Sequence, residues 1–134
     1  MIASPLVSQA VKYREARARI SGLKNDFTRW CRVCYRIKVE SGEIVPFVLN
    51  SVQLKIRRVE EELLAQYGRA RKYILKARQP GVTTEEQAAN LEECWSHRGR
   101  DCITLADKLD KTAKIFEITR RAIEHFPQSL LPQM

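Results

Sequence analysis

The stretch from Tyr73 to Arg98 constrains the fold of this chain most strongly. A short apolar run, 73–75, predicts a buried strand, and a helical pattern extends to Arg98. The loop between them consists of Lys76, Ala77, Arg78, Gln79, Pro80, Gly81, Val82, Thr83 and Thr84. The order strand, glycine-containing loop, helix is typical of loops in which main-chain N–H groups surround a phosphate at the positive end of the helix.

The loop matches the common phosphate-binding pattern G-x-x-x-x-G-K-[ST] only in part. Gly81 fits the second glycine, where a side chain would obstruct the phosphate, and Thr83 fits the hydroxyl residue that binds magnesium. Lys76, however, stands where the first glycine belongs, and Val82 stands where the lysine belongs. The general pattern alone therefore does not establish a phosphate site.

The loop resembles a variant form, K-A-R-Q-x-G-x-[ST]-[ST], of the large subunit of tailed-bacteriophage terminases, in which the cation lies at the front of the loop. Lys76 and Arg78 are both in place for that role. By this resemblance one of the two neutralises the β- and γ-phosphates of ATP, and the sequence does not choose between them. The resemblance further implies that Thr83 binds Mg²⁺ through the nucleotide.

Three further segments look like parts of the same family, so that the resemblance covers about residues 36–127. The segment 45–53 is similar to the one that precedes the loop, and it implies that Gln53 contacts the adenine. Segments 103–107 and 116–127 look like the next strand and helix. Gln53 also lies three residues after Asn50, so it can close a capping box at the start of a helix, and both roles can coexist.

Ordinary helix capping is the simpler interpretation of the loop itself. Thr83 with Glu86, or Thr84 with Gln87, has the spacing of a capping box, and either threonine can begin the helix to Arg98. Lys76 and Arg78 would then be surface cations.

On the basis of the resemblance, we predict an α/β fold, a partial P-loop NTPase that begins a parallel sheet with strands 73–75 and 102–106. Helices over 5–20 and from 25–26 onward, and a short hairpin around Ser41 and Gly42, precede it. A helix from Asn50 to about Arg69 is expected to turn Leu54, Val59, Leu63 and Tyr67 inward and residues 60–62 to water. The predicted domains are a basic helical region, 1–35, and an incomplete terminase-like ATPase domain, 36–134.

The resemblance implies a function in the motor that uses ATP with Mg²⁺ to move phage DNA into the capsid. Its partners are DNA, the terminase small subunit and the capsid portal, and its location is the cytoplasm of the bacterial host.

Only seven residues follow Pro127, and Asp107 is followed by Lys108 in place of the glutamate of a Walker B strand. We expect no Walker B strand, no nuclease domain and no ATP turnover by this chain alone. No apolar run is long enough for a membrane span.

The alternative function is that of a small non-enzymatic protein that binds nucleic acid. Of the net charge of +8, residues 1–40 carry +6, with nine Lys and Arg against three Asp and Glu. Such a patch can contact phosphates, although a solvated helix face has the same composition. The cations of this alternative are Lys12, Arg14, Arg17, Arg19, Arg29 and Arg32.

The cysteines allow one metal hypothesis. Cys31-x-x-Cys34 together with Cys94-x-x-His97 has the ligand number and spacing of a zinc site. Both pairs fall on predicted helices beside aromatic residues, where cysteines are more often small core residues. We therefore expect no zinc.

Overall fold

The computed structural model describes residues 14, 18, 20–24, 26–75 and 81–130. Residues 20–24 are helical, and most of the predicted helix over 5–20 lies outside the described residues. The later elements are α2 (Phe27–Cys34), β1 (Arg36–Lys38), β2 (Ile44–Pro46), α3 (Ser51–Tyr67), α4 (Val82–Ser96), α5 (Leu109–Glu124) and the 3-10 helix η1 (Gln128–Leu130). None of the described helices is both long enough and apolar enough to cross a membrane.

Local sequence signals correctly predicted α2 and the hairpin that follows it. The Asp26 carboxylate accepts a hydrogen bond of 3.1 Å from the Arg29 N–H and so caps α2. Strands β1 and β2 pair antiparallel, with Ile37 opposite Val45. Gly42, at φ 90°, provides the left-handed conformation that the connecting turn requires.

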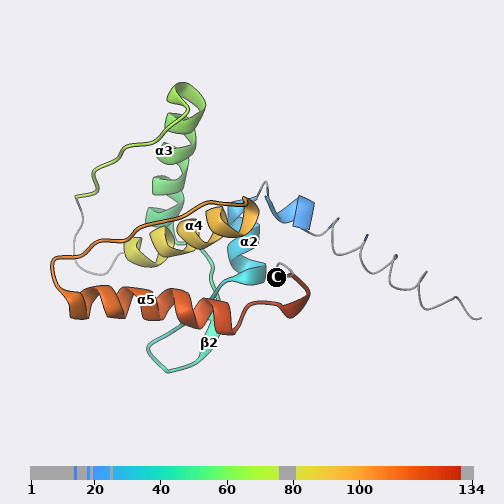
Figure 1. Cartoon of the computed structure of the whole chain (residues 1–134), viewed down its shortest axis with the longest axis vertical. Coiled ribbons are helices and arrows are strands. Elements are labelled where there is room, and N and C mark those ends of the chain that lie inside the picture. Colours follow the sequence, from blue (N-terminus) through green and yellow to red (C-terminus); the bar gives the residue numbers. More distant parts are fainter. Residues whose placement is uncertain (1–13, 15–17, 19, 25, 76–80, 131–134) are drawn as a thin grey trace, which may run out of the picture.

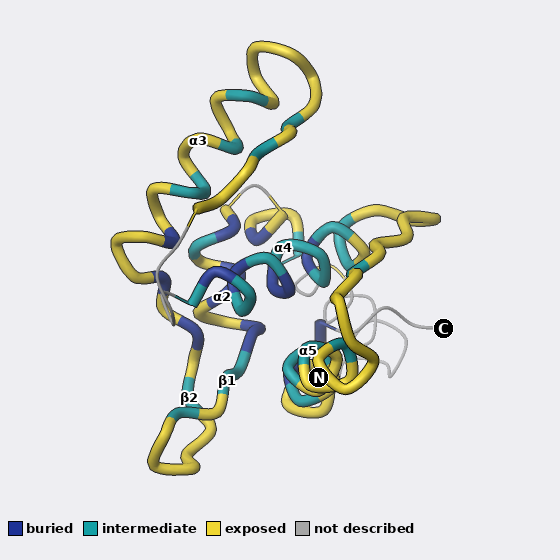
Figure 2. Tube along the Cα trace, turned by 90° about the vertical axis from the view of Figure 1, so that its left-hand side faces the viewer, coloured by how far each residue is buried: buried dark blue, intermediate teal, exposed yellow. Residues whose placement is uncertain are grey.

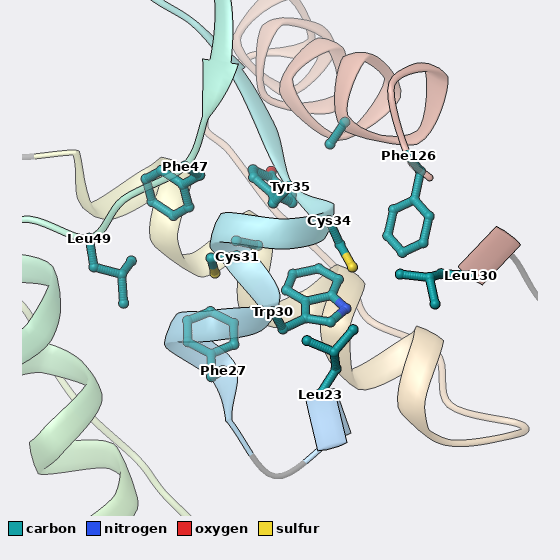
Figure 3. Close-up of a cluster of buried hydrophobic side chains, with 12 residues drawn as sticks. Leu23, Phe27, Trp30, Cys31, Cys34, Tyr35, Phe47, Leu49, Phe126 and Leu130 are labelled. Carbon is teal, nitrogen blue, oxygen red and sulfur yellow. The ribbon is translucent and has the colours of Figure 1, made fainter. Parts of the chain in front are cut away.

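The core is an aromatic cluster centred on Trp30 of α2 (Figure 3). The centroid of its ring lies 5.9 Å from that of Tyr35, 6.0 Å from that of Trp95 and 6.2 Å from that of Phe126. These partners come from the end of α2, from α4 and from the segment after α5, so one side chain joins three parts of the chain. The other buried members are Leu23, Phe27, Cys31, Cys34, Phe47, Leu49, Ala88, Ala122 and Leu130.

Helices α4 and α5 pack against each other below α3 (Figure 1). Ala88 on α4 and Ala122 on α5 are both fully buried, and their small side chains permit a close approach of the helices. After α5 the chain turns back to the core, where the indole N–H of Trp95 donates a hydrogen bond of 2.9 Å to the Leu130 carbonyl. These contacts fix the last described residues to α4.

Helix α3 projects away from the rest of the described chain (Figures 1 and 2). Gln53, in its first turn, is its one buried residue. The prediction that Leu54, Val59 and Tyr67 face inward is wrong, since each is more than 40% exposed. The expected orientation failed because α3 projects from the described core, so most of its length lies beyond the helices that would cover its apolar side chains.

The predicted α/β fold is also wrong. The described residues form a mostly helical structure with a single two-stranded antiparallel sheet, and they contain no parallel sheet and so no P-loop NTPase-like fold. Residues 73–75 and 102–106 are not strands. Tyr73 and Leu75 are fully exposed, and Ile103 and Leu105 are more than 80% exposed. A strand requires a neighbour to accept and donate its main-chain hydrogen bonds, and the apolar composition of these runs could not supply one.

Candidate functional site

The start of α4 is the first part of the candidate site. Gly81 is the N-cap, with φ 77° and ψ 17°, and its carbonyl accepts the first hydrogen bond of the helix, from the Glu85 N–H at 3.2 Å. The predicted capping by Thr83 or Thr84 is therefore wrong, because both residues lie within the first turn. The N–H groups of residues 82–84 have no acceptor inside the helix, and they point out of its positive end.

Gln53 connects α3 to this helix start. Its Nε2 donates a hydrogen bond of 2.8 Å to the Gly81 carbonyl, and its Oε1 accepts one of 2.8 Å from the Asn50 N–H. The Asn50 side chain in turn accepts a hydrogen bond of 2.9 Å from the Gln53 N–H. The predicted capping box is thus confirmed. The two segments that the resemblance connects with adenine and with phosphate lie next to each other.

The contact explains why position 81 is glycine. A Cβ added there would lie 2.6 Å from the Gln53 Nε2, closer than two such atoms can approach. The positive φ independently disfavours any side chain. Gly81 therefore allows both the left-handed N-cap and the close contact with Gln53.

Gln53 as placed here does not present a free amide to a ligand. Both polar atoms of its side chain already contact the main chain, and the residue is only 3% exposed. Its contact with adenine stays a prediction that no contact in the structure tests. Of the predicted loop, Lys76, Ala77, Arg78, Gln79 and Pro80 lie outside the described residues, so the choice between Lys76 and Arg78 also stays open.

A group of charged residues, which the sequence did not reveal, lies beside the first turns of α4. Carboxylate oxygens of Glu60, Glu85 and Glu86 lie within 4.8 Å of one another. The ammonium group of Lys72 bridges Glu60 and Glu86, at 2.7 Å from the latter, and Arg57 pairs with Glu60 at 3.3 Å. The run of glutamates at 60–62 had been expected to face water, so no sequence signal indicated that Glu60 takes part.

Glu85 is the unusual member of this group, because its side chain is fully buried. Among the described residues, neither oxygen of its carboxylate has a hydrogen-bond partner. Burial, followed by the charge of Glu86, raises the pKa of Glu85 to about 7. Below that pH Glu85 is neutral and Glu86 is paired with Lys72, so these residues place little net negative charge at the positive end of α4.

The residues of the zinc hypothesis are separated. Cys31 and Cys34 are fully buried in the aromatic core, and burial raises the pKa of both thiols, that of Cys34 to about 11. Cys94 is exposed and lies next to Cys102 instead. Among the described residues, the only set of three or more potential ligand side chains is the glutamate group above.

Asp107 does not resemble an acidic metal ligand at the end of a strand. It is exposed and forms an ion pair of 2.9 Å with Lys111 in the first turn of α5. The hydrogen bond from Lys111 lowers the pKa of this carboxyl.

The candidate site consists of the start of α4, Gln53 and the charged residues beside them. Neither family models, nor curated proteins, nor solved structures gave a match to this chain.

Proposed function

We propose that this chain is part of the large subunit of a tailed-bacteriophage terminase and that it binds the phosphates of ATP with Mg²⁺ at the start of α4. The observation that carries the proposal is the hydrogen bond from Gln53 to the Gly81 carbonyl. It joins two segments that are separate in the sequence and that the resemblance assigns to one nucleotide site. Capping of each helix by its own residues does not require the two segments to be in contact.

The chemistry of the helix start supports an anion as the ligand. The N–H groups of the first turn and the helix dipole favour negative charge there. Thr83 lies in the first turn, where its hydroxyl can bind a metal ion held by the phosphates. Lys76 or Arg78 would supply the positive charge that Val82 cannot.

Gln53 has a positioning role in this proposal. Its amide holds the Gly81 carbonyl and thereby sets the direction of the first turn of α4. A direct contact with adenine would require the amide to exchange one of its two main-chain partners for the base. The proposal therefore makes the phosphates the principal ligand and the adenine contact a secondary one.

The activity of the parent protein would be ATP-driven movement of DNA into a capsid, in the cytoplasm of a bacterial host. DNA, the terminase small subunit and the portal would be its partners. Arg14, Lys24, Arg29 and Arg32 are the described cations of the basic region, all of them exposed, and they offer a surface for DNA phosphates.

Equilibrium titration with a fluorescent ATP analogue in the presence of Mg²⁺ tests the proposal. We expect affinity to fall in the order ATP, ADP, AMP, because the phosphates carry the contact. Replacing the operative cation, in Lys76→Ala or Arg78→Ala, should weaken binding about tenfold, as loss of one charge-assisted hydrogen bond does. Lys114→Ala, an exposed change on α5, is the matched control and should bind as the wild type does.

The metal contact has its own test in the same assay. Thr83→Val keeps the shape of the side chain and removes the hydroxyl, so it should weaken binding when Mg²⁺ is present and have no effect when EDTA is added. Absence of any binding of ATP to the folded protein would contradict the proposal. Strongly salt-dependent DNA binding that ignores ATP with Mg²⁺ would instead favour the basic nucleic-acid-binding alternative.

A further inference from the structure

Two exposed cysteines come together at the end of α4. Cys94 lies in the last turns of that helix, and Cys102 lies in the extended segment that follows it. Their sulfur atoms are 3.7 Å apart, and the Cys102 thiol is also 3.6 Å from the Asn90 carbonyl. Asn90 and Cys94 are four residues apart and so share one face of the helix, over which Cys102 lies.

The contacts on either side of Cys102 keep it in this place. Gly99, at φ 70°, provides the left-handed turn that directs the chain back along α4. Two residues beyond Cys102, the Thr104 hydroxyl accepts a hydrogen bond of 2.9 Å from the buried Gln87, which Thr119 of α5 also contacts at 3.0 Å. The proximity of the two thiols thus follows from a fixed path of the chain.

The two thiols alone do not form a typical metal site. No third potential ligand side chain joins Cys94 and Cys102 within the described residues, although stable metal sites with thiolates usually have three or four protein ligands. The distance between the sulfur atoms exceeds the bond length of a disulfide, about 2.05 Å, by an amount that side-chain rotation can close. Both thiols are accessible to a reagent in water.

We propose that Cys94 and Cys102 form a reversible disulfide within the chain when a small-molecule disulfide such as oxidised glutathione is present. The Cys94 thiolate attacks one sulfur of the reagent, which gives a mixed disulfide and releases one glutathione thiolate. The Cys102 thiolate then attacks the Cys94 sulfur and releases the second glutathione. The two protein thiols lose two protons and two electrons, and one oxidised glutathione becomes two reduced molecules.

The order of the two steps follows from the surroundings of the thiols. The Cys102 thiol contacts both the Cys94 sulfur at 3.7 Å and the Asn90 carbonyl at 3.6 Å, and burial raises its pKa to about 11, which reduces its reaction with a reagent in solution. Once Cys94 carries glutathione, the neighbouring Cys102 has its target within reach. Cys102 is therefore the resolving thiol.

The disulfide would fix the segment 101–106 to the end of α4 by a covalent bond. In the reduced protein the described contacts of this segment with α4 are hydrogen bonds. Closing a loop in the unfolded chain usually stabilises the folded one. Oxidation should therefore raise the melting temperature by several degrees, and dithiothreitol should reverse the rise.

Peptide mapping of the full chain after equilibration in glutathione buffers of defined ratio tests the proposal. Arg98 and Arg100 lie between the two cysteines, so trypsin separates them unless a disulfide holds the peptides together. We expect a linked pair of peptides from monomeric protein. Cys102→Ser should instead accumulate a glutathione adduct at Cys94, because it lacks the resolving thiol.

Cys31 and Cys34 are internal controls, because their burial should prevent reaction until the protein is unfolded. Separate glutathione adducts on Cys94 and Cys102 of the wild type, a disulfide between two molecules, or two free thiols under oxidising ratios would each overturn the proposal. The disulfide does not require a bound nucleotide, so the outcome of peptide mapping and the outcome of the ATP titration are independent.

Discussion

The side-chain amide of Gln53 donates a hydrogen bond of 2.8 Å to the main-chain carbonyl of Gly81, 28 residues further along the chain. The same side chain closes the capping box of α3 by accepting a hydrogen bond from the Asn50 N–H. One glutamine thus connects the starts of α3 and α4. This arrangement makes the candidate phosphate site sensitive to changes in either helix.

Gly81→Ala should destabilise the protein by about 2 to 3 kcal/mol, measured by urea unfolding. The left-handed φ disfavours a side chain, and the new Cβ would displace the Gln53 amide. Gly68→Ala is the matched control, because Gly68 has φ 70° but no described atom within 4 Å of an added Cβ. Gly68→Ala should cost only the backbone term, about 1 kcal/mol. Equal losses in the two variants would contradict a specific role for the Gln53 contact.

Gln53→Glu separates the two contacts of this side chain. Glutamate can still accept the hydrogen bond from the Asn50 N–H, since glutamate is the usual residue at this position of a capping box. It cannot donate to the Gly81 carbonyl, and its charge would face that oxygen. We expect a loss of about 1 to 3 kcal/mol in the free energy of unfolding. Gln66→Glu, an exposed change in the last turn of α3, introduces the same charge and should cost less than about 1 kcal/mol, through the helix dipole alone.

Glu85→Gln should alter the pH dependence of stability. Because the folded-state pKa is about 7 and the ordinary value is 4.5, the folded protein binds more protons than the unfolded chain between these values. The free energy of unfolding therefore falls as the pH rises from about 4.5 to about 7, and it levels off above the folded-state pKa, where Glu85 is ionised in both states. Glutamine mimics the protonated side chain and removes this loss, which is on the order of 2 kcal/mol.

The measurement for Glu85→Gln is the free energy of unfolding from pH 5 to pH 8, in wild type and variant. The difference between them should move in favour of the variant as pH rises. Glu62→Gln, on the exposed face of α3, is the control and should leave the profile unchanged. A constant difference across this range would mean that Glu85 does not titrate as its burial requires.

Gln87→Leu should cost about 2 to 3 kcal/mol, because it removes the hydrogen bonds to both Thr104 and Thr119. Thr104→Val should cost less, since it breaks only one of them. A double-mutant cycle of the two positions, followed by urea unfolding, should show a coupling energy of about 1 kcal/mol. Additive effects would show that the segment 101–106 is not held to α4 through Gln87.

Sequence-local signals determined where several helices and the hairpin begin and end. Asp26 marked the start of α2, the spacing of Asn50 and Gln53 marked that of α3, and the turn at Gly42 marked the hairpin. These features depend on hydrogen bonds between residues a few positions apart, so the order of residues is sufficient to predict them. The resemblance likewise singled out Gln53 and Gly81 from residue order alone.

Only the tertiary structure decided which distant groups meet. Apolar composition predicted strands at 73–75 and 102–106, but a strand exists only where a neighbouring strand exchanges hydrogen bonds with it, and none is described beside either run. The burial of Glu85 and the meeting of Cys94 with Cys102 depend on how α3, α4 and the segment after α4 pack. The sequence by itself determined the local hydrogen bonds, and packing between distant segments determined the core, the charged group and the thiol pair.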